Sequence, residues 1–176
     1  MIYTKKGDKG YTKNFKGEKI SKSDIRIKAL GAIDELNSFC GAIVSFSLSE
    51  AHFTKAKTMI LKIQNDLFVI QSILGGSNLK LNIKNVKWLE RNIDIMTNEM
   101  PKLDKFIIPG GVNSASIAHI SRGVCRRAER EITALSKKEK IEPNILKYIN
   151  RLSDFFFTLA RFINYQNNFQ ETSPKY

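Results

Sequence analysis

The stretch SRGVCRRAEREI, residues 121–132, carries the pattern that decides the fold of this chain. At about 3.6 residues per helical turn, Arg122, Arg126 and Arg130 project from one face of a helix. The apolar residues of the same region fall on a different face: Val124, Ala128, Ile132 and Leu135. The pattern therefore predicts a helix that is buried along one side and cationic along another.

The arginines of this stretch need an anionic counterpart, because clustered guanidinium groups repel one another. Glu129, three residues after Arg126, supplies part of it, but a positive surplus remains. The planar fork of arginine suits phosphate and carboxylate oxygens, so a polyphosphate is a natural ligand. The alternative is a solvated helix face laced with salt bridges, which is common for helices rich in Arg and Glu.

Length and charge set the broad class of protein. The 176 residues carry a net charge of +12, and 42% of them are hydrophobic. This length predicts one domain, residues 1–176, with a core large enough to need no disulfides. The positive charge favours nucleotides, nucleic acid or a membrane surface as partners. It is equally compatible with a general lysine bias, because the lysines are spread along the whole chain.

The cysteines and the hydropathy indicate a protein of a reducing compartment. Cys40 and Cys125 both fall in apolar helical registers, where a cysteine usually serves as a small buried hydrophobe. No run of 18 apolar residues is present, and the N-terminus lacks the apolar region of a signal peptide. We expect a cytoplasmic protein that has no membrane partner.

Residues 1–22 do not have a helical pattern. Gly7 and Gly10 interrupt a run of Lys, Thr and Asp. Such a loop could surround phosphates with backbone amides, hydroxyls and the ammonium groups of Lys5, Lys6 and Lys9. It contains no Walker A sequence. The alternative interpretation is a basic N-terminal arm without fixed structure.

Beyond Lys22 the apolar residues recur with helical spacing, within 29–43, 56–74, 86–100, 117–135 and 145–163. Gly75 and Pro101 are expected to stop the second and third helices, and Pro143 to begin the last. We predict an all-α, antiparallel five-helix bundle over residues 23–166, with no strand of useful length. The tail, residues 167–176, is expected to fray.

Three positions near the fourth and fifth helices raise more specific expectations. The sequence FIIPGG, residues 106–111, is typical of a constrained loop that leads into a helix, with Asn113 or Ser114 as the cap. His119 fits the edge of the core better than a binding site. Asn150, Asp154 and Arg161 are predicted to share a polar stripe on the last helix.

Three blocks of sequence together resemble the PduO-type ATP:cob(I)alamin adenosyltransferases, or corrinoid adenosyltransferases. The first is IYTKKGDKGYT with KISKSD and GAIDELNS, within residues 2–38. The second is FIIPGG followed by AHISRGVCRRAER, within 106–130, and the third is YINRLSDFFFTLAR, 148–161. They occur in the order and at the spacing of the family and cover essentially the whole chain.

The resemblance implies a transferase with a ferritin-like five-helix bundle that assembles as a homotrimer. ATP and a corrinoid would bind in clefts between neighbouring subunits. The reaction would transfer the 5′-deoxyadenosyl group of ATP to the cobalt of cob(I)alamin, giving adenosylcobalamin and tripolyphosphate. Because cob(I)alamin is itself a strong nucleophile, the protein would need to orient the reactants and neutralise the leaving group, with Mg²⁺ held through the phosphates.

The resemblance also assigns roles to individual residues. The nucleotide loop matches Thr4, Lys5, Lys6, Gly7, Lys9, Gly10 and Thr12, with Lys22 reaching in from just before the first helix. The second nucleotide segment matches Arg126, Arg127, Glu129 and Arg130, and a polar contact from the last helix matches Asn150. Of these, Arg126, Arg130 and Asn150 are the candidate catalytic residues. Phe106 matches an apolar residue beside the lower face of the corrin, and Asp34 and Arg122 match a charged pair across the subunit interface.

Departures from the family and rival functions stay open at this point. The family usually has threonine where this chain has Lys6, which leaves the hydroxyl contact of the loop in doubt. A basic helical module that binds RNA or DNA is one rival, although we expect no nucleic-acid partner. A bundle that carries a corrinoid without chemistry is another. The resemblance further implies a reductase and an adenosylcobalamin-dependent enzyme as partners.

Overall fold

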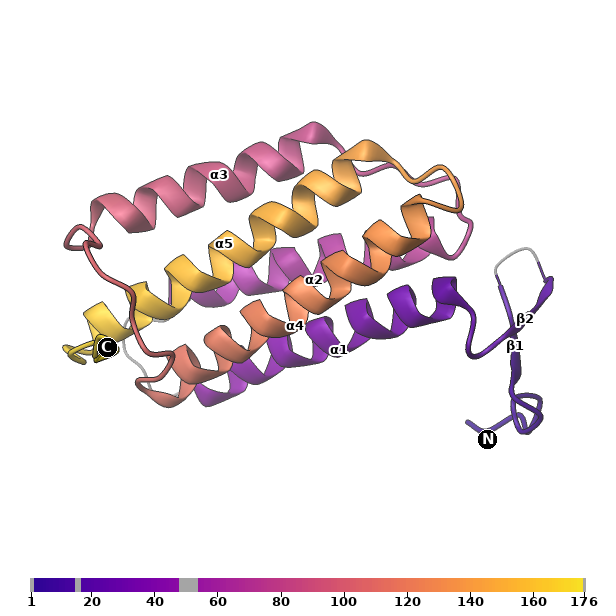
Figure 1. The fold of residues 1–176 in the computed structure, drawn as a ribbon, viewed down its shortest axis with the longest axis horizontal. Coiled ribbons are helices and arrows are strands. Elements are labelled where there is room, and N and C mark those ends of the chain that lie inside the picture. Colours follow the sequence, from indigo (N-terminus) through magenta and orange to yellow (C-terminus); the bar gives the residue numbers. More distant parts are fainter. Residues whose placement is uncertain (1, 15–16, 48–53, 176) are drawn as a thin grey trace.

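The computed structural model of the chain describes residues 2–14, 17–47 and 54–175. In this part, two short strands precede five helices: β1 (Tyr11–Lys13), β2 (Lys19–Ser21), α1 (Ile25–Phe46), α2 (Thr54–Leu74), α3 (Ile83–Asn98), α4 (Asn113–Ser136) and α5 (Pro143–Gln166). The helices lie side by side as one elongated bundle, and the strands project beyond the end where α1 begins (Figure 1). The predicted helical bundle is confirmed.

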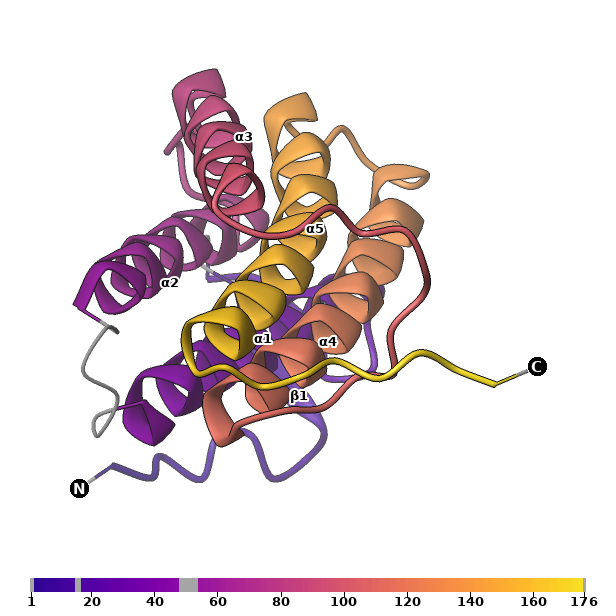
Figure 2. The same ribbon diagram turned by 90° about the vertical axis from the view of Figure 1, so that its left-hand side faces the viewer.

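Helices α1, α4 and α5 form the centre of the bundle. Helix α4 packs against both α1 and α5, while α2 covers α1 and α3 covers α5 (Figures 1 and 2). The apolar stripes of the helices pack together as the core, which includes the fully buried Ile33, Ile63, Ile132 and Phe156. Burying such side chains contributes about 1.5–3 kcal/mol each, so the helices hold together through their shared core.

Helix boundaries mostly follow local sequence signals. Asp24 caps α1 by accepting a hydrogen bond from the Arg26 amide, and α5 begins with Pro143 at its first turn. Helix α2 ends at Leu74, just before the expected Gly75. The cap predicted for α4 is wrong, because the N-cap position is Val112 and no side chain of α4 provides that bond. The start of α4 is held from another helix, because Asn164 of α5 accepts a hydrogen bond from the Val112 amide at 3.2 Å.

A polar cluster around Asp66 ties three helices together inside the bundle. The Asp66 carboxylate, 7% exposed, accepts from the Tyr148 hydroxyl of α5 at 3.0 Å and from Asn85 Nδ2 of α3 at 2.8 Å. Lys62, one turn earlier on α2, pairs with the same carboxylate at 2.6 Å. The buried carboxylate is therefore well supplied with donors, as a group taken out of water must be.

The sequence predicted no strand of useful length, and the structure has two very short strands at the N-terminus. Strands β1 and β2 pair antiparallel, with Thr12 opposite Ile20 at the centre of the ladder. Each strand has three residues, which is too short for a period of two to stand out in the sequence. The hairpin gives the N-terminal loop a fixed base next to α1.

The tail was expected to fray, but the structure shows it in contact with the bundle. Its course, drawn in yellow, runs from the end of α5 past the N-terminal end of α4 (Figure 2). The Thr172 carbonyl accepts a hydrogen bond from the Ile108 amide at 2.8 Å, and the Glu171 carboxylate pairs with Arg161. These contacts lie far apart in sequence, so helical periodicity could not reveal them. Among the described residues, no helix combines the length and hydropathy needed to cross a membrane.

Candidate functional site

A cationic cavity of about 630 Å³ lies within the N-terminal segment. Its lining comes from the loop before β1, both strands and the residue that follows β2: Thr4, Lys6, Gly7, Tyr11, Thr12, Lys13, Lys19 and Lys22. Four of these residues are lysines and none is acidic. A cavity with this lining is suited to an anion that carries several charges, such as a polyphosphate.

Backbone geometry shapes this loop. Lys5 has a φ of +57° and Gly10 a φ of +78°, and the Gly10 carbonyl accepts from the Lys22 amide at 2.9 Å. The chain thus doubles back, which brings Lys22 to the loop. A Cβ at Gly7 would lie 2.8 Å from Lys22 Nζ, so the absence of a side chain there leaves room for the ammonium group.

Only some of the residues predicted for the nucleotide loop line the cavity. Thr4, Lys6, Gly7, Thr12 and Lys22 line it, whereas Lys5, Lys9 and Gly10 belong to the same loop but are not in the lining. Sequence reasoning missed Lys13 and Lys19. The strand pairing places them opposite each other, and the ammonium of Lys19 lies 4.1 Å from the centre of the Tyr11 ring. A recognised hairpin would have pointed to both lysines.

The predicted arginine face of α4 is exposed along its second half. Arg126 and Arg130 are both exposed, and within residues 2–14, 17–47 and 54–175 neither makes a hydrogen bond or an ion pair. Their guanidinium groups are thus available to an anion from outside this chain. Arg127 points elsewhere, because it forms an ion pair with Glu35 of α1.

Glu129 and Asn150 come together across the α4–α5 interface. Asn150 Nδ2 donates to Glu129 Oε1 at 2.9 Å. The two residues are 21 positions apart, and the predicted site brought them together only by resemblance. The bond orients the Asn150 amide so that its oxygen faces away from the carboxylate and remains free to accept.

Asp34 and Arg122 do not meet within one chain. The Asp34 carboxylate accepts a long hydrogen bond, 3.4 Å, from Gln71 of α2. The Arg122 guanidinium lies over the Phe157 ring, with its central carbon 5.6 Å from the ring centre. Both charges therefore remain open to a partner.

The segment between α3 and α4 presents an apolar surface. Phe106 is 79% exposed, and Ile108 and Ile120 are also exposed. Next to Ile120 lies a cavity of about 290 Å³ that Pro109, Gly110, Ser116 and His119 also line. Exposed apolar residues close to a cavity are typical of a binding surface. Such a surface suits a large, flat, largely apolar ligand.

Two kinds of titratable group are buried in the bundle: cysteines and a histidine. Burial raises the pKa of Cys40 and of Cys125 above the ordinary thiol value, which leaves both thiols protonated and unreactive, as expected. His119 is 8% exposed, and burial lowers its pKa, with Arg122 acting in the same direction and Glu171 against it. Its burial agrees with the predicted place at the edge of the core.

The comparisons with known proteins agree on one family. The family model described as cobalamin adenosyltransferase matches residues 2–163. The corrinoid adenosyltransferase of Bacillus subtilis is 42% identical over 167 residues, covering 93% of this chain and 86% of that protein. Human corrinoid adenosyltransferase MMAB is 37% identical over 180 residues, covering 97% of this chain and 71% of that protein.

Solved structures are equally similar. A variant of the PduO-type ATP:corrinoid adenosyltransferase from Lactobacillus reuteri, complexed with cobalamin and ATP, is 37% identical and has a TM-score of 0.94. The match covers 100% of both chains. The chain belongs to the cobalamin adenosyltransferase family. It is a transferase that moves the adenosyl group of ATP to cobalamin, which makes the nucleic-acid module and the inert corrinoid carrier the weaker interpretations.

A cobalamin adenosyltransferase must bind the phosphates of ATP, and this chain has two cationic surfaces suited to them: the cavity of the N-terminal segment and the arginine face of α4. The cavity has no lining residue from α4. Figure 1 shows why: the N-terminal hairpin projects beyond the bundle, whereas α4 runs along it beside α1. The two cationic surfaces of one chain do not form a single site.

Proposed function

We propose that this chain transfers the 5′-deoxyadenosyl group at a site completed by two subunits of a homotrimer. The observation that carries the proposal is the separation of the cationic cavity of residues 4–22 from the exposed Arg126 and Arg130. A second copy of the chain could present its arginines to that cavity. The open charges of Asp34 and Arg122 support the same assembly, since they could pair across the interface.

The nucleotide would be held by residues from both subunits. Backbone amides and hydroxyls of Thr4, Gly7 and Thr12, with the ammonium groups of Lys6 and Lys22, would contact the phosphates from one side. Arg126 and Arg130 would contact them from the other, with Asn150 oriented by Glu129. Arg127 and Glu129 would support this face, since Arg127 is tied to Glu35. Lys5, Lys9 and Gly10 would shape the loop.

The proposed reaction requires no covalent bond between the protein and either reactant. The electron pair that forms the cobalt–carbon bond belongs to cob(I)alamin, and the pair of the broken C5′–O bond leaves with tripolyphosphate. The residues of the chain therefore align the reactants and neutralise the growing charge on the leaving group. Lysines and arginines are the side chains suited to that task.

The corrin would lie against the apolar surface of Phe106, Ile108 and Ile120. Phe106 would take the place of the lower axial ligand and leave cobalt(II) four-coordinate, which makes it easier to reduce. The 79% exposure of Phe106 supports this role, because a phenylalanine is usually buried unless it meets a ligand or partner.

Mg²⁺ would enter together with ATP. This ion keeps phosphate oxygens and water as most of its ligands, so it needs no cage of protein carboxylates. Within the described ranges, no group of three or more His, Cys, Asp and Glu side chains is close enough to hold a metal ion. The residues of the chain would act on the phosphates rather than on the ion.

A reductase that supplies cob(I)alamin and an enzyme that takes up adenosylcobalamin are further partners that we propose.

Mixed trimers test whether the site is shared. Lys22→Ala removes a cation of the N-terminal cavity, and Arg126→Ala removes one of α4, so each variant alone should be nearly inactive with ATP, Mg²⁺ and cob(I)alamin. When the two are co-expressed with different tags and hybrids are purified, each hybrid trimer has about one site in three with both intact residues. We expect about a third of the wild-type rate of adenosylcobalamin formation.

The control for this experiment is the double variant Lys22→Ala/Arg126→Ala mixed with wild type under the same conditions. If each subunit contained a whole site, hybrids of the single variants would be as inactive as their parents, and the proposal would be wrong. Products are identified as well, because release of ADP or free phosphate in place of tripolyphosphate would indicate an ATPase or a kinase.

A further inference from the structure

The connection between α3 and α4, residues 99–112, carries Phe106 but contains neither helix nor strand. Phe106 is 79% exposed, so its own side chain does little to hold it in place. The position of its ring is therefore set by the backbone on either side. The end of α5 and the tail contact that backbone at points before and after Phe106.

Asn164 of α5 holds the Pro-Gly-Gly turn after Phe106. This side chain is 1% exposed, and its amide donates to the Gly110 carbonyl at 2.9 Å and accepts from the Val112 amide at 3.2 Å. Gly111 lies between the two, with a φ of +123°. A Cβ there would come within 1.9 Å of Asn164 Oδ1, so only glycine lets the turn and the amide approach so closely.

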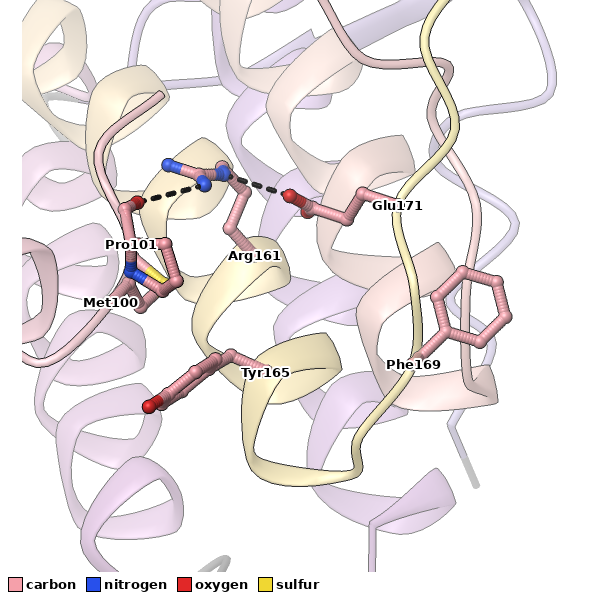
Figure 3. A pocket seen from close by; sticks show the side chains of 6 residues that line it. All are labelled: Met100, Pro101, Arg161, Tyr165, Phe169 and Glu171. Atoms are coloured by element: carbon pink, nitrogen blue, oxygen red, sulfur yellow. Dashed lines mark hydrogen bonds and ion pairs between the residues drawn. The ribbon is translucent and has the colours of Figure 1, made fainter. Parts of the chain in front are cut away.

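Arg161, one helical turn before Asn164, reaches both the connection and the tail. Figure 3 shows its guanidinium between the Glu171 carboxylate and the Pro101 carbonyl. The Nε atom lies 3.0 Å from Glu171, and Nη2 donates to the Pro101 oxygen at 3.4 Å. The two side chains are 11% and 19% exposed, so water screens the pair less than it screens pairs at the surface.

The tail then contacts the connection next to Phe106. The residue after Glu171, Thr172, accepts from the Ile108 amide through its backbone oxygen at 2.8 Å. The ion pair therefore fixes the part of the tail that supplies this bond. Ile108 is two residues from Phe106, so the hydrogen bond restricts the backbone that carries the ring.

We propose that Arg161, Asn164 and Glu171 are positioning residues for Phe106. They touch neither ATP nor cobalt, and they act by reducing the number of conformations that the connection can adopt. This inference rests on the proposed role of Phe106 at the corrin. Loosening the connection lowers the fraction of molecules in which the ring occupies the axial position, and the nucleotide side of the site is unaffected.

The test uses Glu171→Gln, which removes the charge of the pair and keeps its size. We expect the rate from cob(II)alamin with an excess of chemical reductant to fall about tenfold, since a hydrogen bond between charged groups is worth roughly that factor. The rate from cob(I)alamin and the KM for ATP should stay within about twofold. The double variant Arg161→Glu/Glu171→Arg, which restores the pair in reverse, should recover part of the loss.

Glu139→Gln is the matched control. Glu139 pairs with Arg26, which also donates to a backbone carbonyl, that of Leu74, at the opposite end of the bundle. This pair thus repeats the layout of Arg161 and Glu171 away from Phe106. Its loss should leave the ratio of the two rates unchanged.

Hydrogen exchange of the Ile108 amide gives a readout that does not depend on activity. Exchange should accelerate in Glu171→Gln and in Asn164→Asp, which loses the donor to Gly110, but not in Glu139→Gln. Unchanged exchange, or an equal rise in the KM for ATP and for cobalamin, would overturn the inference. If Phe106→Ala itself shows no defect from cob(II)alamin while Ile108 exchange does respond, the proposed role of Phe106 is what fails, and the positioning of that ring has no function.

Discussion

At the scale of single residues, the exposed cations and the exposed aromatic ring of the proposed site lie on different elements of the chain. Arg126 and Arg130 leave their guanidinium groups exposed on α4, whereas Phe106 exposes a ring on the α3–α4 connection. Each type of group suits one part of the reaction. In the proposed mechanism, arginine would stabilise the anionic leaving group, and an apolar ring would keep a ligand away from cobalt.

The first prediction separates these two roles. Arg126→Ala should lower kcat/KM for ATP by about 10²–10³, the usual effect of losing one aligned donor to developing charge. The loss should persist when cob(I)alamin is supplied already reduced, because reduction is not the step affected. Phe106→Ala should show its main defect from cob(II)alamin and a much smaller one from cob(I)alamin. The formation of adenosylcobalamin is followed by its visible spectrum.

Equal defects of both variants from either oxidation state would contradict this division of roles. Arg91→Ala is a suitable control, since Arg91 is an exposed arginine of α3 outside the proposed site. It should behave as wild type in both assays.

At the scale of elements, the bundle depends on polar contacts as well as on apolar stripes. Asp66 joins α2 to α3 through Asn85 and to α5 through Tyr148. Arg127 and Glu35 join α4 to α1. The difference between them is burial: Asp66 is 7% exposed, whereas the side chains of the second pair are both 46% exposed. The buried cluster should therefore matter far more for stability.

The second prediction concerns this buried cluster. Asp66→Ala should lower the free energy of unfolding by about 1–3 kcal/mol, because it leaves the fully buried Tyr148 hydroxyl without its acceptor. Tyr148→Phe should cost about 1 kcal/mol, since Asp66 keeps its other two donors. Both values are measured by urea denaturation. The exposed neighbour Asn65 provides the control, and an Asp66→Ala variant as stable as Asn65→Ala would remove the structural role of the cluster.

At the scale of the whole molecule, the bundle alone does not complete the proposed active site. The cavity of the N-terminal segment and the arginines of α4 each supply cations, but they lie on different parts of one chain. Among the residues that the structure describes, Asp34 and Arg122 likewise pair with no opposite charge: Asp34 contacts Gln71, and Arg122 lies over Phe157. Assembly would explain both features.

The third prediction tests this assembly. If Arg122 pairs with Asp34 of a neighbouring subunit, Arg122→Ala should weaken the trimer by about 3–5 kcal/mol per contact, because one charge is left stranded at an interface. Sedimentation velocity at decreasing protein concentration should show dissociation at a higher concentration than for wild type. The KM for ATP or cobalamin should rise in parallel. Unchanged mass and kinetics would exclude the pair from the interface.

The sequence by itself determined the helices, the family and most of the cationic residues. Apolar residues at helical spacing predict a buried face wherever they occur, because the period is a local property of the chain. The boundaries at Leu74 and Pro143 followed from Gly75 and from the proline itself, which are local signals as well. The arginines of residues 121–132 were recognisable because a helix places residues four apart on one face.

Only the tertiary structure decided which residues meet. Asn150 binds Glu129, Asn164 binds the backbone at the start of α4, and Glu171 anchors a tail that was expected to fray. The β1–β2 hairpin brought Lys13 and Lys19 into the cationic cavity. Each of these contacts joins segments that pair through hydrogen bonds or charge rather than through a repeating apolar pattern. Their positions depend on how the helices pack, and periodicity carries no information about that packing.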